Sequence, residues 1–237
     1  MNKIRVSAVS YTNTKPFVYG LRHSGIIDKI DLSLDIPSDC ANKLINNQAD
    51  IGLVPVAALL DIPNYQIVSD YCIGATGAVD SVFIFSDKPI QEIKSIRLDS
   101  HSRTSNNLAL VLLKNYWKLQ PEVVEKGADA FVLIGDRTFG KKNQYQYAYD
   151  LAQEWQNFTS LPFAFAVWAS NKPVNEKFVK EFNTALKLGL DKRLEVIKDQ
   201  PLNGFDLRDY LQNKLDFNLD NKKRQAIDMF HGYIKAL

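Results

Sequence analysis

PSDCANKLINNQADIGLVP, residues 37–55, is the stretch of sequence that decides the fold. Its opening proline and serine are typical of a helix start, and Ala41, Leu44 and Ile45 would form the buried face of that helix. After a polar turn, residues 50–54 have the length and apolar content of a short buried strand. A helix, a turn and a buried strand in this order predict an α/β fold built on a parallel sheet.

The flanking sequence supplies the other elements that such a sheet needs. Residues 4–8 alternate apolar and polar side chains as a strand does, and a turn-prone loop at residues 10–16 follows them. In the middle of the chain, residues 125–136 repeat the pattern of a polar turn, an apolar run and a stop at glycine and aspartate. Two such units predict two lobes.

The connection between the lobes also follows from the sequence. No low-complexity linker separates the two units, so paired crossover strands are the simplest connection. We place the crossings near residues 86 and 168. Residues 1–86 together with 169–237 would then form the first lobe, and residues 87–168 the second.

Further elements are expected around these crossings. Residues 81–85 and 163–168 have the apolar content of buried strands, and residues 102–117 predict a helix with Ser102 as its cap. The chain beyond the second crossing is predicted to be helical. Its basic triplet at residues 222–224 is expected on a solvated helix face.

The composition excludes several classes of protein. Across 237 residues, 29 basic and 27 acidic side chains give a net charge of +2 without long runs of one sign, a balance that does not favour nucleic-acid binding. Cys40 and Cys72 are isolated and predict buried thiols rather than a metal site. Residues 161–169, the longest strongly apolar run, fall far short of the roughly 20 residues of a transmembrane helix, and no signal peptide is recognisable. We therefore expect a cytoplasmic protein with no membrane partner.

Six short motifs occur in a fixed order along the chain. They are YTNTKPF (residues 11–17), ADIGLVP (49–55), GAVDSVFIFS (77–86), SRTS (102–105), IGD (134–136) and LPFAFAVW (161–168). Together they resemble the chorismate dehydratase family of the futalosine route to menaquinone, over about residues 3–170. Two positions depart from the family pattern, Thr12 where an apolar residue is expected and Ser160 where a glycine commonly stands.

The resemblance implies a fold and an activity. The fold would be the type II periplasmic-binding-protein fold, with a substrate cleft between its lobes. The activity would be that of a hydro-lyase, which removes water from chorismate to give 3-[(1-carboxyvinyl)oxy]benzoate. No cofactor motif or glycine-rich phosphate loop is visible in the sequence, and nothing in it indicates an oligomeric state.

The candidate catalytic and substrate-binding residues follow from the same resemblance and from the negative charge of chorismate. Asn13 and Ser81 are the polar positions most similar to the family's catalytic site, and Tyr11 and Thr12 share the first motif loop with Asn13. Chorismate carries two carboxylates, for which a helix N-terminus supplies N–H donors and a favourable dipole. The substrate-binding candidates at such an N-terminus are Ser102, Arg103, Thr104 and Ser105, with Asp136 as a secondary candidate after a strand end.

The chemistry of these candidates constrains the mechanism. Dehydration requires a base that removes a proton from carbon, and the motif loops are poor in histidine and carboxylates. Asn13 and Ser81 are neutral and cannot act as strong bases. Our hypothesis is that they orient chorismate so that its own enolpyruvyl carboxylate takes the proton, while lobe closure excludes water.

Two other functions remain open at this point. The same fold serves non-catalytic solute-binding and sensor proteins, which hold ligands by the same closure. A related lyase or synthase of the futalosine pathway could act on another cyclic carboxylate. One such enzyme, 1,4-dihydroxy-6-naphthoate synthase, opens with a Pro-Asn-Asp type loop that YTNTKPF does not match.

Overall fold

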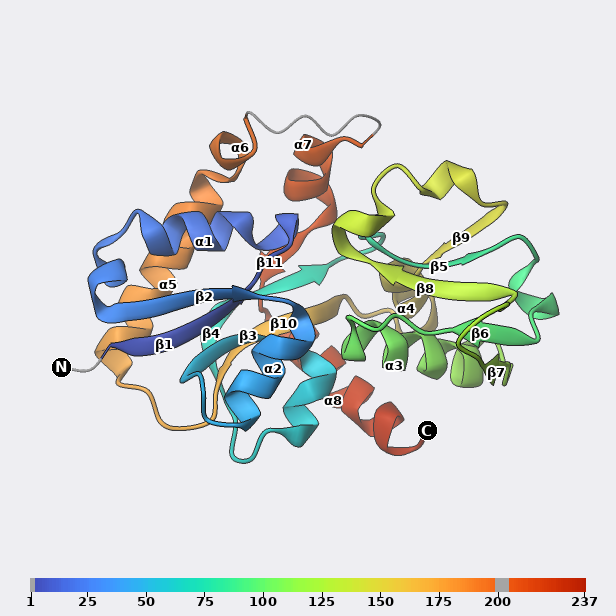
Figure 1. The fold of residues 1–237 in the computed structure, drawn as a ribbon, viewed down its shortest axis with the longest axis horizontal. Coiled ribbons are helices and arrows are strands. Elements are labelled where there is room, and N and C mark those ends of the chain that lie inside the picture. The colour runs from blue at the N-terminus through green and yellow to red at the C-terminus, as the bar shows by residue number, and fades with distance from the viewer. Residues whose placement is uncertain (1–2, 199–204) are drawn as a thin grey trace.

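Two β-sheets organise the computed structural model, which describes residues 3–198 and 205–237 (Figure 1). The strands of the first sheet are β1 (Ile4–Val9), β2 (Ile30–Asp35), β3 (Ile51–Pro55), β4 (Gln66–Ala75), β10 (Phe163–Ser170) and β11 (Asp216–Asn218). The strands of the second sheet are β5 (Val82–Ser86), β6 (Ser95–Arg97), β7 (Glu122–Val123), β8 (Ala130–Ile134) and β9 (Tyr147–Asp150). Their spatial orders are β11-β4-β10-β3-β1-β2 and β7-β6-β8-β5-β9.

Helices cover both sheets. The α-helices are α1 (Lys15–Arg22), α2 (Pro37–Ile45), α3 (Arg103–Val111), α4 (Leu151–Thr159), α5 (Glu176–Asp191), α6 (Arg193–Val196), α7 (Leu207–Asp209) and α8 (Asn221–Lys235). Short 3-10 turns are η1 (Thr12–Thr14), η2 (Gly25–Lys29), η3 (Val56–Asp61), η4 (Ile90–Glu92), η6 (Gly135–Thr138) and η7 (Lys142–Gln144), and η5 (Leu112–Tyr116) and η8 (Tyr210–Lys214) are π-helical. Figure 1 shows α1 and α5 on one side of the first sheet and α2 and α8 on the other.

Residues 37–55 form α2 and β3, as the sequence predicts, and every residue of β3 is buried. Strand β1 pairs in parallel with β2 and β3, whereas β10 runs antiparallel to both β3 and β4. The first sheet is therefore mixed rather than wholly parallel, because the chain returns to it from the second sheet in the opposite direction.

Strands β5 and β10, which lie next to the two predicted crossings, each belong to the opposite sheet from the one expected. The prediction of a boundary at residue 86 placed residues 81–85 with the first lobe, but β5 pairs with β8 and β9 in the second sheet. The boundary at residue 168 placed residues 163–168 with the second lobe, but β10 lies inside the first sheet. These two strand placements are corrected, since buried apolar runs fit the interior of either sheet. The lobe division itself stays a prediction.

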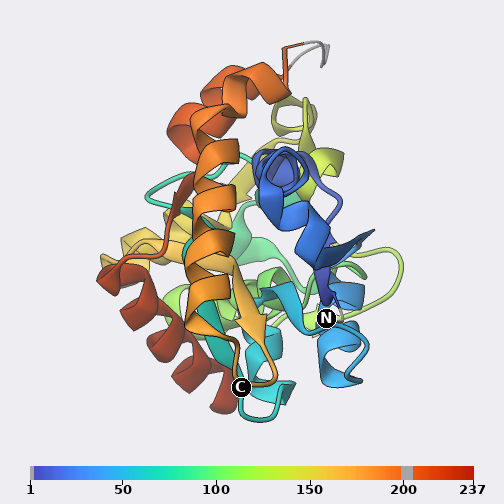
Figure 2. The same ribbon diagram turned by 90° about the vertical axis from the view of Figure 1, so that its left-hand side faces the viewer.

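Helices α1 and α5 pack unusually closely, as Figure 2 shows from the side. A Cβ atom on Gly20 would collide with the backbone oxygen of Ala185, and one on Gly189 would collide with that of Pro16. Both glycines are required by this contact rather than by a turn. It fixes α1, which follows directly after the loop that carries Asn13.

The predicted helix at residues 102–117 is confirmed as α3 followed by η5. Ser102 caps it as expected, since its hydroxyl oxygen accepts a hydrogen bond from the N–H of Ser105 at 3.0 Å. Asp150 caps α4 in the same way and also accepts from Val79 and Asp80. This carboxylate therefore fixes the segment by which the chain passes from β4 to β5.

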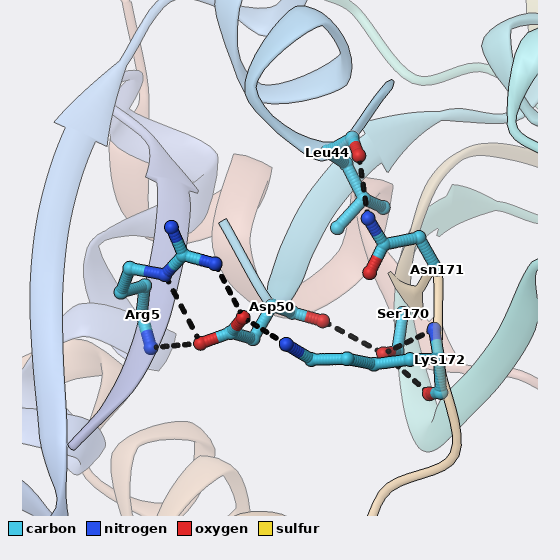
Figure 3. A network of polar contacts seen from close by, with 6 residues as sticks. All are labelled: Arg5, Leu44, Asp50, Ser170, Asn171 and Lys172. Atoms are coloured by element: carbon cyan, nitrogen blue, oxygen red, sulfur yellow. Dashed lines mark hydrogen bonds and ion pairs between the residues drawn. The ribbon is translucent and has the colours of Figure 1, made fainter. Parts of the chain in front are cut away.

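A network of charged and polar groups joins β1, β3 and β10 at one end of the first sheet (Figure 3). The Asp50 carboxylate accepts from the Arg5 backbone N–H at 2.8 Å, from the Arg5 guanidinium at 2.7 and 3.2 Å, and from Lys172 Nζ at 2.5 Å. The Ser170 hydroxyl donates to the Asp50 carbonyl at 2.7 Å. Burial of Asp50 opposes ionisation, but its hydrogen bonds with Arg5 and Lys172 outweigh burial and hold the pKa of this carboxyl below its usual range.

The expectation of a solvated basic face at residues 222–224 is wrong for Lys223. Its side chain is fully buried, and Nζ lies 2.5 Å from Asp216 and 3.6 Å from Asp220. The acidic partners on β11 and at the start of α8 compensate the buried charge, which the sequence spacing did not reveal. Cys40 and Cys72 are buried free thiols, as predicted. Among the residues of known placement, no helix is long and apolar enough to cross a membrane.

Candidate functional site

A pocket lies between the two sheets, at the carboxyl ends of β1, β3 and β8. The space within it, open solvent included, is about 550 Å³. Val9, Pro55 and Ile134 mark the three strand ends in its wall, and β10 contributes Phe165 and Ala166. Ligands of α/β proteins commonly bind at such strand ends, because the loops that follow them converge there.

Asn13 and Ser81 both line this pocket, although they belong to different parts of the chain. Asn13 lies in η1, directly after β1, and Ser81 immediately precedes β5. The hydroxyl of Tyr210 joins them: it donates a hydrogen bond to Ser81 Oγ at 2.9 Å and shares a side-chain hydrogen bond with Asn13. Two residues of the predicted site are therefore brought together by a third that was not predicted.

The N-terminus of α3 forms another wall. Ser102, Thr104 and Ser105 all line the pocket. Ser102 accepts from the Ser105 N–H, and Thr104 Oγ1 accepts from the Ala57 N–H at 3.2 Å. Since the first N–H groups of a helix have no intrahelical partner, this end presents donors and a positive partial charge to the pocket.

Three predicted substrate contacts lie outside the pocket lining. Arg103 points to the exterior, where its guanidinium pairs with Asp61 at 2.8 Å and donates to Asn42 at 3.2 Å. Thr12 and Asp136 contact each other, since the Asp136 carboxylate accepts from the Thr12 backbone N–H at 3.1 Å and from its hydroxyl at 2.9 Å. Asp136 therefore ties the loop after β8 to the loop after β1.

Tyr11 lines the pocket and contacts residues that follow strands of the second sheet. Its hydroxyl is 3.2 Å from His101 Nδ1, and its ring packs on Gly135, whose φ of +63° and lack of a Cβ atom make this approach possible. Arg137 lies close to the same hydroxyl, and its Nη2 donates to both carboxylate oxygens of the buried Asp99 at 2.7 and 2.8 Å. The motif loop is thus held across the pocket by several polar contacts.

The pocket is electrically neutral in its immediate lining. In the placed part of the chain, no Lys, Arg, His, Asp or Glu side chain lines it. Burial raises the pKa of Tyr11. Burial also raises the pKa of Tyr210 far above its ordinary value, although the hydrogen bonds between Tyr210 and its neighbours Ser81 and Asn13 lower it. Both tyrosines therefore stay protonated near neutral pH, and neither is a ready base. Residues 3–198 and 205–237 also contain no cluster of side chains suited to a metal ion.

Comparison with known proteins gives the chain its family. A family model described as menaquinone biosynthesis matches residues 4–236. The chain belongs to this menaquinone-biosynthesis family. The match extends beyond the residue 170 limit of the sequence motifs and so includes the C-terminal segment that carries Tyr210.

Two similar proteins are named chorismate dehydratase. The chain is 24% identical to the chorismate dehydratase of Thermus thermophilus over 93% of its own length and 91% of that protein's. It is 29% identical to the chorismate dehydratase of Campylobacter jejuni over 59% and 58% of the two chains.

Solved structures establish the fold. An Archaeoglobus fulgidus protein superposes with a TM-score of 0.73 at 15% identity, covering 99% of this chain and 97% of that one. A Candida albicans protein described as having the generic periplasmic-binding-protein fold superposes with a TM-score of 0.69 at 14% identity, covering 100% and 91%. The periplasmic-binding-protein-like α/β fold expected from the motifs is confirmed.

The sequence analysis missed three residues that contact the predicted site residues. Tyr210 follows Leu207–Asp209 in a stretch without a family motif, and Arg137 follows the IGD motif. His101, whose Nδ1 lies 3.2 Å from the Tyr11 hydroxyl, is likewise not among the predicted site residues. A tyrosine at the start of a short helical segment carries no spacing signal, so the contact of Tyr210 with Ser81 could be recognised only in three dimensions.

Proposed function

We propose that this member of the menaquinone-biosynthesis family is a chorismate dehydratase, a hydro-lyase that converts chorismate into 3-[(1-carboxyvinyl)oxy]benzoate. The observation that carries the proposal is the convergence of Asn13 and Ser81 on one pocket. A relative named chorismate dehydratase, which is similar over 93% of the chain, supports it. The cytoplasmic location expected from the sequence goes with this proposal.

The neutral pocket lining supports a reaction in which the substrate supplies its own base. A ring C–H bond of chorismate breaks at the carbon that carries the ether, and the enolpyruvyl carboxylate takes the proton. The electron pair enters the ring as it becomes aromatic, and the neighbouring C–O bond breaks. The proton taken from carbon ends on the departing hydroxide, so one water leaves and the enolpyruvyl carboxylate is ionised again. Asn13 and Ser81 would hold the ring in the geometry that brings carboxylate and hydrogen together.

The two carboxylates of chorismate need partners that do not compete for the proton. The N-terminus of α3 offers backbone N–H donors together with the hydroxyls of Thr104 and Ser105. Such neutral donors stabilise a carboxylate without placing a full positive charge beside it. Tyr11 and Thr12 would close this site by their contacts with His101 and Asp136, which makes closure between the sheets part of catalysis.

Incubation of the purified protein with chorismate, without added metal or nucleotide, tests the proposal. The expected product has the mass of chorismate less one water and the aromatic NMR signals of a 3-substituted benzoate. An Asn13→Ala variant is the control for contaminating activity and should form this product much more slowly. Chorismate that binds but returns unchanged would contradict the proposal and favour a solute-binding or sensor role, the alternative that the shared fold leaves open.

A further inference from the structure

The hydroxyl of Tyr210 is a buried polar group beside the site. The proposed reaction assigns no function to it. The side chain is 1% exposed, and its ring makes edge-on contacts with Phe139 and Phe205 at centroid distances of 5.3 and 5.4 Å. Such packing holds the ring in one orientation, so the hydroxyl group is held in one place. It lies beside the two residues that are expected to orient chorismate.

The hydrogen bonds around this hydroxyl have a direction. Tyr210 has one hydroxyl hydrogen, and it is donated to Ser81 Oγ. The hydrogen of Ser81 must then point elsewhere, and the open side of Ser81 is the pocket. Asn13 accepts from the Thr14 hydroxyl through Oδ1 at 3.1 Å, which leaves its amide N–H groups as donors for Tyr210 and for a ligand.

The consequence is a site of fixed polarity. Because Tyr210 donates to Ser81 Oγ, the single hydrogen of the serine hydroxyl is free to be donated to a ligand in the pocket. This arrangement favours a substrate atom opposite Ser81 that accepts a hydrogen bond. In dehydration the departing hydroxyl oxygen gains negative charge as its C–O bond breaks, and a fixed donor stabilises this charge where it develops.

Building on the proposed function, we propose that Tyr210 is a positioning residue that fixes Ser81 as a hydrogen-bond donor to the departing hydroxyl of the substrate. Tyr210 itself need not touch the substrate. Its effect passes through Ser81, so the two residues should act as one unit in the reaction.

A double-mutant cycle tests this dependence. We expect Ser81→Ala to lower kcat by about 10²-fold, the usual effect of removing one donor to a developing charge. Tyr210→Phe should lower kcat by about 10-fold with little change in KM, as expected for the loss of one neutral hydrogen bond. In the Ser81→Ala background, Tyr210→Phe should cost no more than about twofold, because the group it positions is already absent.

Tyr149→Phe is the matched control. The Tyr149 hydroxyl accepts from the Ile90 N–H at 2.9 Å, on strand β9 and away from the pocket lining. This variant also loses one hydroxyl from a partly buried tyrosine, so it should show a comparable stability change with unchanged kcat. A loss of activity through general loosening of the fold would appear in both variants.

A second pair of variants keeps the test decisive if Tyr210→Phe does not fold. Incorporated 4-methylphenylalanine at position 210 retains the volume of tyrosine without a donor, whereas 4-aminophenylalanine restores one. Activity recovered by the amino but not by the methyl side chain supports the proposal. Equal activity of the two, or an equal effect of Tyr210→Phe with and without Ser81, would overturn the role of Tyr210 and leave the proposed function intact. A wild-type protein inactive on chorismate would overturn both.

Discussion

The polar cluster around Asp50 and the polar cluster around Tyr210 lie at opposite ends of β1, β3 and β10, and they differ in almost every physical respect. Asp50 is surrounded by the cations of Arg5 and Lys172, whose side chains are 43% and 49% exposed. Tyr210, Ser81 and Asn13 carry no charge, and Tyr210 and Ser81 are buried. Charge is placed where water can screen it, and neutral donors are placed where a ligand must be desolvated.

This difference separates stability from function. The Asp50 cluster satisfies its own groups within the protein and joins three strands (Figure 3). The Tyr210 cluster leaves the hydrogen-bonding capacity of Ser81 and Asn13 directed at the pocket. A change at Asp50 should therefore affect unfolding, and a change at Asn13 or Ser81 should affect turnover.

The largest expected effect is on turnover. Asn13→Ala should lower kcat on chorismate by about 10²-fold or more, since it removes groups that orient the substrate. Its melting temperature should stay close to that of the wild type, because Asn13 is only half-buried. Steady-state kinetics and thermal unfolding of the same preparation measure both quantities. Near-normal turnover would remove Asn13 from the mechanism.

The converse change should affect stability alone. Asp50→Asn removes the charge that Arg5 and Lys172 share and should lower the free energy of unfolding by about 1–2 kcal/mol, a modest value because both cations are half-exposed. Urea denaturation measures this, and kcat should be unchanged. A large fall in kcat in a well-folded Asp50→Asn protein would break the separation between the two clusters.

The pH dependence of stability provides a sharper test of the Asp50 cluster. The pKa of Asp50 is lower in the folded than in the unfolded protein, so its stabilisation is complete above the ordinary carboxyl pKa of about 4 and is lost as the pH falls below it. Unfolding free energies measured from neutral to acid pH should therefore fall less steeply in Asp50→Asn than in the wild type. Parallel curves for the two proteins would show that Asp50 does not carry this dependence.

The smallest expected effect belongs to neither cluster. Ser160 has a left-handed φ of +62° at the end of α4, a conformation that favours glycine. Ser160→Gly should raise the free energy of unfolding by up to about 1 kcal/mol, because relief of strain exceeds the entropy cost of glycine. Thermal unfolding measures this change, and kcat should be the same as that of the wild type. A destabilised variant would show that the serine side chain compensates the strain.

Much of the fold could be predicted from the sequence because it is encoded locally. The helix and strand of residues 37–55 and the Ser102 cap depend on neighbouring residues, and the structure confirms them. The sheet that each of β5 and β10 would join could not be predicted. Both are buried apolar runs, and a buried run fits the interior of either sheet.

The site was predictable only in part, for a similar reason. Asn13, Ser81 and the α3 hydroxyls were found through their motifs, and the structure places them in one pocket. Arg103 has an exterior partner in Asp61, and Lys223 has buried partners on β11, neither of which is visible in local sequence. Tyr210 lies 129 positions from Ser81 along the chain, so only folding brings its hydroxyl to Ser81.

The structure of the Ser81→Ala protein with bound chorismate tests most directly whether the substrate supplies its own base. We expect the ring to lie beside Asn13 in the pocket between the sheets, with the enolpyruvyl carboxylate turned toward the hydrogen that is removed. A ring bound elsewhere, or a histidine, aspartate or glutamate side chain against that hydrogen, would contradict it.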